Sequence, residues 1–171
     1  MMRAIVLAAG KGTRMKSGRS KVLHEICGRP MLWYVLDALR RAGFGEIVVV
    51  VNPELRDEMR GFDVESVVQE EQLGTGHAVK SALDQLAPGK GPLIVVCGDM
   101  PLVTSELLGG MAGSLGSGDA SAMALVTVKM PLPSSFGRIV RSGPHVERIV
   151  EVRDATPAEL AIDEMNAGIY A

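Results

Sequence analysis

Residues 4–15 read Ala-Ile-Val-Leu-Ala-Ala-Gly-Lys-Gly-Thr-Arg-Met, a short apolar run that ends in a loop of glycines and basic residues. The run at residues 4–8 predicts a buried strand that leads directly into the loop. Similar runs occur at residues 47–51, 64–68, 92–97 and 122–128, and helical patterns at residues 31–39, 53–59, 77–86 and 105–115. Continuous apolar strands that alternate with helices predict an α/β fold with a mostly parallel, doubly wound sheet.

The pattern changes towards the end of the chain. Residues 138–141 and 146–152 flank a Ser-Gly turn, which predicts a β-hairpin excursion, and residues 165–171 predict a further strand. The Gly/Ser-rich residues 109–118 predict a loop. Because the sequence stops inside an apparent strand, we expect it to be a fragment, or an unusually short form, of a longer protein.

The composition is typical of one globular domain, so residues 1–171 are expected to form a single domain. Aromatic residues are only 4% of the chain, which favours a core of aliphatic side chains. The net charge of −2 gives no indication of a nucleic-acid partner. No targeting signal or membrane-length apolar run is visible, so we expect a cytoplasmic location and no membrane partner. Cys27 and Cys97 have no metal-binding spacing, and both are expected to be reduced thiols.

Positive charge is concentrated at the start of the chain. Residues 1–41 hold nine Lys and Arg against two acidic residues, whereas the remainder holds nine basic and 18 acidic residues. This asymmetry indicates a small anionic ligand near the amino terminus. A solvated helix face is the alternative, and it accounts for Arg40 and Arg41. It does not account for five basic residues within a Gly-rich segment at residues 11–21.

The Gly-rich loop follows the first strand, where ligands of open α/β sheets bind. Glycines let backbone N–H groups approach phosphate oxygens, and Lys11, Arg14 and Lys21 supply charge for several phosphates. The alternative is a glycine turn with solvent-facing basic residues. Two known phosphate loops do not match, because Met15 replaces the third glycine of the dinucleotide fingerprint and no Walker A sequence occurs. The second strand also ends at Asn52, where a dinucleotide-binding fold needs an acid.

An acidic residue, Asp99, follows the buried strand at residues 92–97. It is expected at the same edge of the sheet as the loop. A carboxylate facing a triphosphate is repelled unless a cation lies between them, and Mg²⁺ held by a carboxylate and phosphate oxygens meets that need. The alternative is an aspartate that caps the next turn. The adjacent phosphate loop favours the metal.

Several segments together form a recognisable pattern: LAAGKGTRM at residues 7–15, KVL at 21–23, QLGTGH at 72–77, GDMPL at 98–102, FGRI at 136–139, IVE at 149–151, DAT at 154–156 and NAGI at 166–169. This pattern resembles a known family, the uridylyltransferase half of bacterial bifunctional N-acetylglucosamine-1-phosphate uridylyltransferase/glucosamine-1-phosphate acetyltransferase. The likeness runs along the whole chain. It implies a three-layer, Rossmann-like nucleotide-diphospho-sugar transferase fold with a mixed, mostly parallel sheet.

The resemblance also implies a reaction, in which UTP and N-acetylglucosamine 1-phosphate give UDP-N-acetylglucosamine and pyrophosphate with Mg²⁺. It implies that the catalytic residues are Arg14, Lys21 and Asp99, and that Asp99 binds the metal. The implied substrate-binding residues are Leu7, Ala8, Ala9, Gly10, Lys21, Gln69, Gly74, Thr75, Cys97, Gly98, Asp99, Gly137, Glu151 and Asn166. Residues 7–10, Gln69, Gly74 and Thr75 belong to the uridine, and Gly137, Glu151 and Asn166 belong to the sugar.

The residue types agree with this chemistry. The attacking oxygen belongs to an ionised phosphate, so no general base is needed and positioning plus charge neutralisation suffice. Uracil selection needs a group that donates and accepts, which suits the carboxamide of Gln69. Without the resemblance, Glu151 could equally be a surface acid on a hairpin. His77 is expected to support the uracil loop rather than to take part in catalysis.

The sequence departs from the family pattern at Phe136, where an aromatic hydroxyl is common, and at Ala167, where threonine is common. The family's second metal ligand, an asparagine, and its hexapeptide β-helix are not in this sequence, so no acetyltransferase activity is expected of it. The family trimerises largely through that β-helix, so the oligomeric state stays open. The alternatives are a nucleotide-binding module without turnover, or a nucleotidyltransferase for another base or acceptor.

Overall fold

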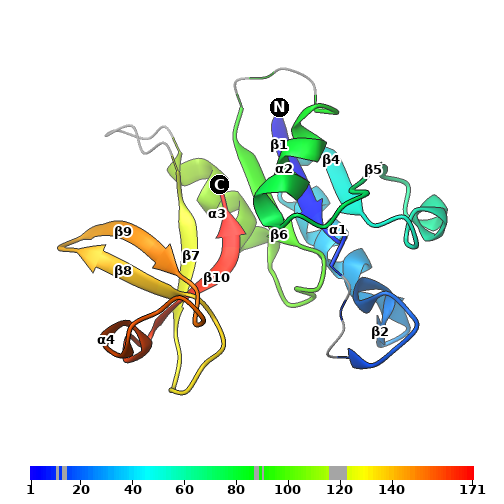
Figure 1. Cartoon of the computed structure of the whole chain (residues 1–171). Helices are drawn as coiled ribbons and strands as arrows, with labels where there is room; N and C mark the ends of the chain where they lie inside the picture. Colours follow the sequence, from blue (N-terminus) through cyan, green and yellow to red (C-terminus); the bar gives the residue numbers. More distant parts are fainter. Residues whose placement is uncertain (11, 13–14, 87–88, 90, 116–122) are drawn as a thin grey trace. The chain divides into compact units, whose positions relative to one another are not determined.

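The computed structural model describes residues 1–10, 12, 15–86, 89, 91–115 and 123–171 (Figure 1). The chain, for which the composition predicts one domain, contains two compact units: Met1–Met123 with Ala171, and Ala124–Tyr170. The first unit contains β1 (Met2–Leu7), η2 (Lys21–Leu23), β2 (Glu25–Ile26), β3 (Arg29–Pro30), α1 (Met31–Arg41), β4 (Phe44–Val51), η3 (Asp57–Gly61), β5 (Glu65–Val68), α2 (Thr75–Leu83), β6 (Leu93–Cys97) and α3 (Ser105–Ser114). The second contains β7 (Leu125–Lys129), β8 (Arg138–Ser142), β9 (His145–Val150), α4 (Pro157–Leu160) and β10 (Glu164–Tyr170).

The first unit is built on a parallel sheet with the strand order β5-β4-β1-β6. Leu7, the last residue of β1, lies beside Val50 of β4 and Cys97 of β6, and Val51 lies beside Val68 of β5. The strands therefore end at one common edge. The chain leaves β1 towards β4 on one side and later returns to β6 on the other, which is the crossover where α/β sheets bind ligands.

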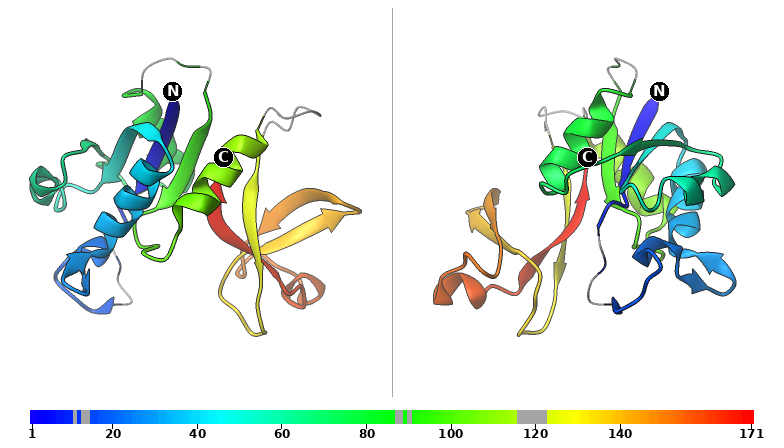
Figure 2. Two further views of the ribbon diagram at one scale, coloured as in Figure 1. Left: turned by 180° about the vertical axis from the view of Figure 1, so that it is seen from behind. Right: turned by 45° about the vertical axis from the view of Figure 1, so that its right-hand side comes forward.

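Helices cover both faces of this sheet. Ala78 and Ala82 of α2 pack with Ile5, Val48 and Val50 in one buried cluster. Strand residues alternate between faces, so Val6 points the other way. There, Gly98 lies against Val6, Val22 of η2 and Leu32 of α1. Figure 2, whose left panel shows the molecule from behind, places α1 on the side opposite α2. The layers are helix, sheet and helix, which confirms the predicted α/β fold with its mostly parallel sheet.

The second unit is antiparallel. Strand β10 pairs with β7 and with β8, and β8 forms a hairpin with β9. The hairpin confirms the excursion expected from residues 138–152. Strand β7 runs antiparallel to β10. The antiparallel strands of the second unit agree with the mixed, mostly parallel sheet that the family resemblance implies.

Some local expectations were wrong. Residues 53–59 form a turn followed by the 3₁₀ helix η3, because Asn52 caps the turn through its side chain instead of starting an α-helix. Residues 109–114 lie in α3, so the helical pattern at residues 105–115 is confirmed and the loop predicted from the Gly/Ser content is wrong there. Thr104 begins this helix by accepting a hydrogen bond from the Leu107 amide at 3.2 Å. No helix among the described residues is long and apolar enough to span a membrane.

Candidate nucleotide-binding site

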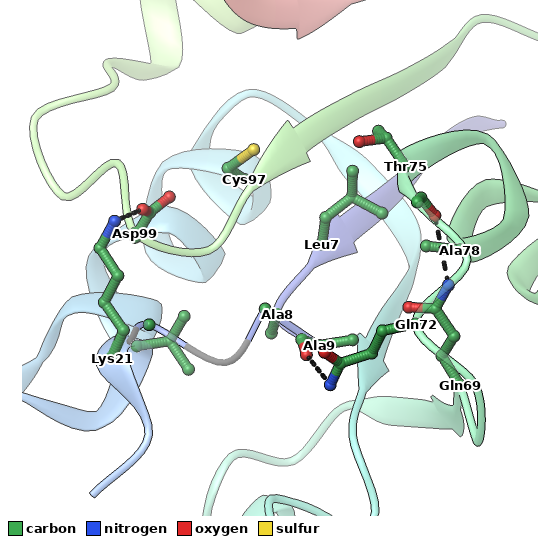
Figure 3. A pocket seen from close by; sticks show the side chains of 14 residues that line it. Leu7, Ala8, Ala9, Lys21, Gln69, Gln72, Thr75, Ala78, Cys97 and Asp99 are labelled. Carbon is green, nitrogen blue, oxygen red and sulfur yellow. Dashed lines mark hydrogen bonds and ion pairs between the residues drawn. The ribbon is translucent and has the colours of Figure 1, made fainter. Parts of the chain in front are cut away.

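A cavity of about 390 Å³ opens at the edge of the first unit's sheet where β1, β5 and β6 end (Figure 3). Its lining residues come from segments that are far apart in the sequence: Leu7, Ala8, Ala9, Gly10, Gly12, Lys21, Val22, Gln69, Gln72, Gly74, Thr75, Ala78, Cys97 and Asp99. The structure thus brings together the expected uridine and phosphate residues of this unit except Lys11, Arg14 and Gly98. Arg14 lies outside the described residues, as do Lys11 and Thr13.

Gly98 is packed closely against neighbouring elements of the first unit. Its amide donates to the Leu7 carbonyl at 2.9 Å, and a Cβ added to it would lie 3.2 Å from side-chain atoms of Leu32 and Val22. It therefore holds β6 against β1 and η2. Gly12 is also tightly placed, since its φ is +56° and an added Cβ would lie 2.9 Å from the Cβ of Lys21.

Two side chains hold the start of the loop in place by donating to the Ala9 carbonyl. The Gln72 side-chain nitrogen donates to it at 2.8 Å, and the Asn52 side-chain nitrogen at 3.5 Å. The Asn52 oxygen in turn accepts from the Leu55 amide at 2.8 Å. Neither side chain was expected from the sequence to contact this carbonyl. The Asn-Pro pair that ends β4 was the signal for Asn52, since asparagine before proline favours a side-chain-capped turn.

Gln69 follows β5 and is almost fully buried, with 3% of its surface exposed. Its Nε2 donates to the Gly74 carbonyl at 3.2 Å and lies 2.9 Å from Nδ1 of His77. Gly74 precedes α2 with a φ of +104°, a conformation that glycine adopts without strain. The buried carboxamide is thus held by the segment expected to contact uridine.

Lys21 and Asp99 form an ion pair on the opposite side of the pocket, between Nζ and Oδ2 (Figure 3). Lys21 opens η2 and Asp99 follows β6, so the crossover edge brings the pair together. Cys97 lies beside them, and burial raises the pKa of its thiol to about 11, with a smaller contribution from the Asp99 carboxylate. Cys97 is therefore protonated at neutral pH and lines the pocket as a weakly polar group.

Asp99 can serve as one carboxylate ligand of a metal ion that takes its other ligands from water and substrate. No group of three or more His, Cys, Asp or Glu residues that could hold a metal occurs among the described residues. A metal held by protein side chains alone is therefore not indicated in that part of the chain. Mg²⁺ commonly takes one or two carboxylates and completes its shell with waters and substrate phosphates. Asp99, which lines the pocket beside Lys21, fits this mode.

The three residues expected to bind the sugar gather within the second unit. The Asn166 amide donates to the Gly137 carbonyl at 2.9 Å, and a Cβ added to Gly137 would lie 3.2 Å from Oε1 of Glu151. The Asn166 side chain donates to the Tyr170 hydroxyl at 2.6 Å and accepts from the Gly168 amide at 3.0 Å. The cluster unites β8, β10 and the end of β9, which the sequence alone did not place together.

A parallel α/β sheet with a glycine-lined pocket at its crossover, which holds Lys21, Asp99 and the buried Gln69, is typical of a nucleotide-binding domain. The model of the MobA-like NTP transferase domain matches residues 4–159, and the chain belongs to this family. It is 49% identical to the bifunctional protein GlmU of Trichlorobacter lovleyi and 46% identical to that of Bacillus cereus, in each case over 98% of this chain. These matches confirm the family resemblance of the sequence motifs. The chain spans 37% of the length of both relatives.

A solved structure shows the same fold. The structure of UDP-glucose pyrophosphorylase complexed with UDP-glucose superposes with a TM-score of 0.78 over 99% of this chain and 75% of that chain. The sequence identity is 17%, so this likeness concerns the fold alone.

Proposed function

We propose that the domain transfers a uridylyl group from UTP to N-acetylglucosamine 1-phosphate, with Mg²⁺, and releases pyrophosphate. The observation that carries the proposal is the convergence of Gln69, Lys21 and Asp99 on one cavity with the Gly-rich loop. An amide for a base, a cation for phosphate and a carboxylate for Mg²⁺ are the groups that a nucleoside triphosphate requires. The 46–49% identity to GlmU proteins supports the choice of substrates.

The uridine would occupy the side of the pocket that holds Leu7, Ala9, Gln69 and Gly74. Leu7 and Ala9 give an apolar wall for the flat base, and the Gln72 contact keeps Ala9 in place. The buried carboxamide of Gln69 supplies polar recognition at the base edge. Such a pocket, mostly apolar with a few placed polar groups, is the usual form of a small-molecule site.

The triphosphate would lie along Gly10 and Gly12 towards Lys21 and Asp99. Binding would separate the ion pair, because Lys21 would turn to a phosphate oxygen and Asp99 to the metal. Mg²⁺, when bound, would neutralise phosphate charge and orient the leaving pyrophosphate. Lys21 would stabilise the negative charge that grows on the phosphate oxygens as the reaction proceeds.

In the transfer, a phosphate oxygen of the sugar 1-phosphate attacks the α-phosphorus of UTP. The bond from that phosphorus to the oxygen bridging to the β-phosphate breaks, and the electron pair leaves with pyrophosphate. The attacking oxygen is already ionised, so no protein base takes a proton. Gly137, Glu151 and Asn166 are proposed to bind the sugar, with Glu151 accepting hydrogen bonds from its hydroxyls.

The second candidate is a nucleotide-binding module without turnover. The observation that favours it concerns the metal site. Among the described residues, Asp99 does not belong to a group of three or more His, Cys, Asp or Glu side chains that could hold a metal ion. A nucleotidyltransferase for another base or acceptor is the intermediate alternative.

Asp99→Ala tests the proposal. We expect the chain, incubated with UTP, N-acetylglucosamine 1-phosphate and Mg²⁺, to release pyrophosphate, and the variant to lose at least about a hundredfold in rate because the metal loses its carboxylate. Asp57→Ala, on the exposed face of η3, is the matched control and should keep full activity. Pyrophosphate release measured with UTP, CTP, ATP and GTP defines the base.

The outcomes separate the candidates. UTP binding without pyrophosphate release supports the binding module and rejects the enzyme for this chain. Faster release with another nucleotide supports the intermediate alternative. No binding of any nucleotide contradicts all three.

A further inference from the structure

The carboxamide of Gln69 has a defined orientation. Its nitrogen lies 3.2 Å from the Gly74 carbonyl oxygen, which also accepts the first helical hydrogen bond of α2 from the Ala78 amide at 3.1 Å. A carbonyl oxygen only accepts, so the nitrogen of the carboxamide, not its oxygen, faces Gly74. The helix fixes the carbonyl, and the carbonyl orients Gln69.

His77 holds the same nitrogen from a second direction. Its Nδ1 lies 2.9 Å from Gln69 Nε2, and an amide NH₂ group only donates. Nδ1 therefore accepts, and the proton of the neutral ring is on its Nε2. His77 lies in the first turn of α2, three residues after Gly74, so one helix terminus carries both acceptors. The two hydrogens of the carboxamide are then both used by the protein.

This arrangement leaves Oε1 as the atom that Gln69 can offer to a ligand. Figure 3 shows it turned into the pocket, towards Ala9 and away from Gly74. Oε1 can only accept. Uracil carries a ring N–H at N3 that can donate to it, whereas N3 of cytosine carries a lone pair and would be repelled. A reversed carboxamide would favour cytosine, but it would place oxygen against the Gly74 carbonyl and lose both hydrogen bonds.

We propose that His77 is a positioning residue for base selection: by accepting from Gln69 it locks Oε1 towards the pocket and makes the site prefer a base with a ring N–H over cytosine. The inference rests on the proposed function, because it assumes that the base lies against Gln69. It assigns His77 no contact with the nucleotide. Without the Nδ1 acceptor only the Gly74 contact holds the carboxamide, which is then freer to turn.

Nucleotide binding by His77 variants tests the proposal without any need for turnover. Dissociation constants of UTP, CTP and 3-methyl-UTP, measured calorimetrically with Mg²⁺, should show UTP binding best to the unaltered chain and both other nucleotides binding more weakly. In His77→Leu the preference for UTP over CTP should fall about three- to tenfold, the effect of one lost hydrogen bond. His77→Asn, whose side-chain oxygen can take the place of Nδ1, should restore the preference to within about twofold. Lys80→Leu, on the exposed side of α2, is the matched control.

The results distinguish the two proposals. Equal affinity of the unaltered chain for UTP and CTP contradicts the uridine site of the proposed function. A clear preference for UTP that persists undiminished in folded His77→Leu overturns the role of His77 and leaves the proposed function standing. A parallel loss in His77→Leu, His77→Asn and Lys80→Leu indicates a general effect on α2, which also overturns it.

The unaltered protein gives an independent readout if His77→Leu fails to fold. Long-range ¹H–¹⁵N spectra of the histidine rings report which nitrogen carries the proton. We expect Nδ1 of His77 to be unprotonated and Nε2 to be protonated, with slow exchange of both Gln69 side-chain amide protons. A proton on Nδ1 in the neutral ring would overturn the inference, since that nitrogen could not accept from Gln69.

Discussion

Lys21 and Asp99 pair with each other at the edge of the sheet. Both side chains are partly exposed, at 35% and 26%, so solvent screens their attraction and the pair adds little to the stability of the fold. In the proposed function, both charges serve ligand binding at the edge of the sheet. A triphosphate with Mg²⁺ would offer each of them a stronger partner than the other.

Lys21→Met separates the proposed role of Lys21 in nucleotide binding from its contribution to the stability of the fold. The substitution keeps the apolar stem and removes the charge-assisted hydrogen bond to phosphate, so we expect the affinity for UTP with Mg²⁺ to fall by about tenfold or more. The free energy of unfolding should change by less than about 1 kcal/mol. Calorimetric titration and denaturant unfolding measure the two quantities. Lys80→Met is the control, and unchanged UTP affinity in Lys21→Met would place the phosphates elsewhere.

Gln69 and Gln72 differ in how far their roles could be predicted from the sequence. Gln69 was expected at the uracil, and the structure buries it in the pocket wall. Gln72 lies in the QLGTGH segment, and the sequence assigned it no role. In the structure its side-chain nitrogen lies 2.8 Å from the Ala9 carbonyl oxygen. The acceptor is 63 residues away in the chain, so no local pattern could indicate it.

At the level of elements, end signals proved more reliable than composition. Thr104 begins α3 even though the helix contains three glycines at 109, 110 and 113, because Leu108, Met111 and Ala112 are buried on one side. Helix α4, which was not expected from the sequence, also begins at a clear end signal. Its start is a capping box, in which Thr156 and Glu159 bond each other's backbone amides. The Thr-Pro-x-Glu spacing was the available signal.

An ion pair connects two strands of the second unit. Both oxygens of Glu164 in β10 accept from the Arg141 guanidinium of β8, at 2.6 and 2.7 Å. The hydrogen bonds from Arg141 lower the pKa of Glu164 to about 2, against some desolvation. The two-pronged geometry makes this pair stronger than a single contact.

The lowered pKa predicts a pH dependence of stability. A glutamate in the unfolded chain titrates near about 4.3, so the stability from Glu164 is fully present above that pH and is lost as pH falls through about 2. Glu164→Gln should therefore be less stable than the unaltered chain at neutral pH, and the difference should shrink between about pH 4 and 2. Urea unfolding across this range measures it. Glu70→Gln, in a wholly exposed pair with Arg56, should show a much smaller difference. A gap that stays constant with pH would contradict the assignment.

On the scale of the whole molecule, the aliphatic core of the first unit is what holds the site in place. Few aromatics contribute, as the composition indicated. Leu32, Leu36 and Leu39 of α1 are fully buried, as are Ile5 of β1 and Ile94 of β6. Because the pocket consists of strand ends, its geometry depends on this packing.

Leu36→Ala tests the contribution of the core. Removing a fully buried leucine side chain should lower the free energy of unfolding by about 3 kcal/mol, through lost burial and the cavity left behind. Denaturant unfolding followed by circular dichroism measures the change. Leu107→Ala, at a position that is 39% exposed on α3, should cost less than about half as much. Equal losses in the two variants would show that α1 is loosely packed.

Sequence patterns alone located the main strands and the helices α1, α2 and α3, the Gly-rich loop after the first strand, and the acid and amide that follow later strands. These features are local, since apolar periodicity, glycine and proline act on the residues beside them. The sequence also indicated the shared edge, because parallel strands must end together.

Which side chains come into contact depends on the three-dimensional fold. The pairing of Lys21 with Asp99, the anchoring of Ala9 by Gln72 and Asn52, and the gathering of Gly137, Glu151 and Asn166 all join distant segments. The orientation of Gln69 is the sharpest case. Its residue type permits either end of the carboxamide to face a ligand, and the choice comes from a helix terminus that places Gly74 and His77 beside it. Hydrogen-bond direction depends on three-dimensional neighbours, which no single-sequence pattern encodes.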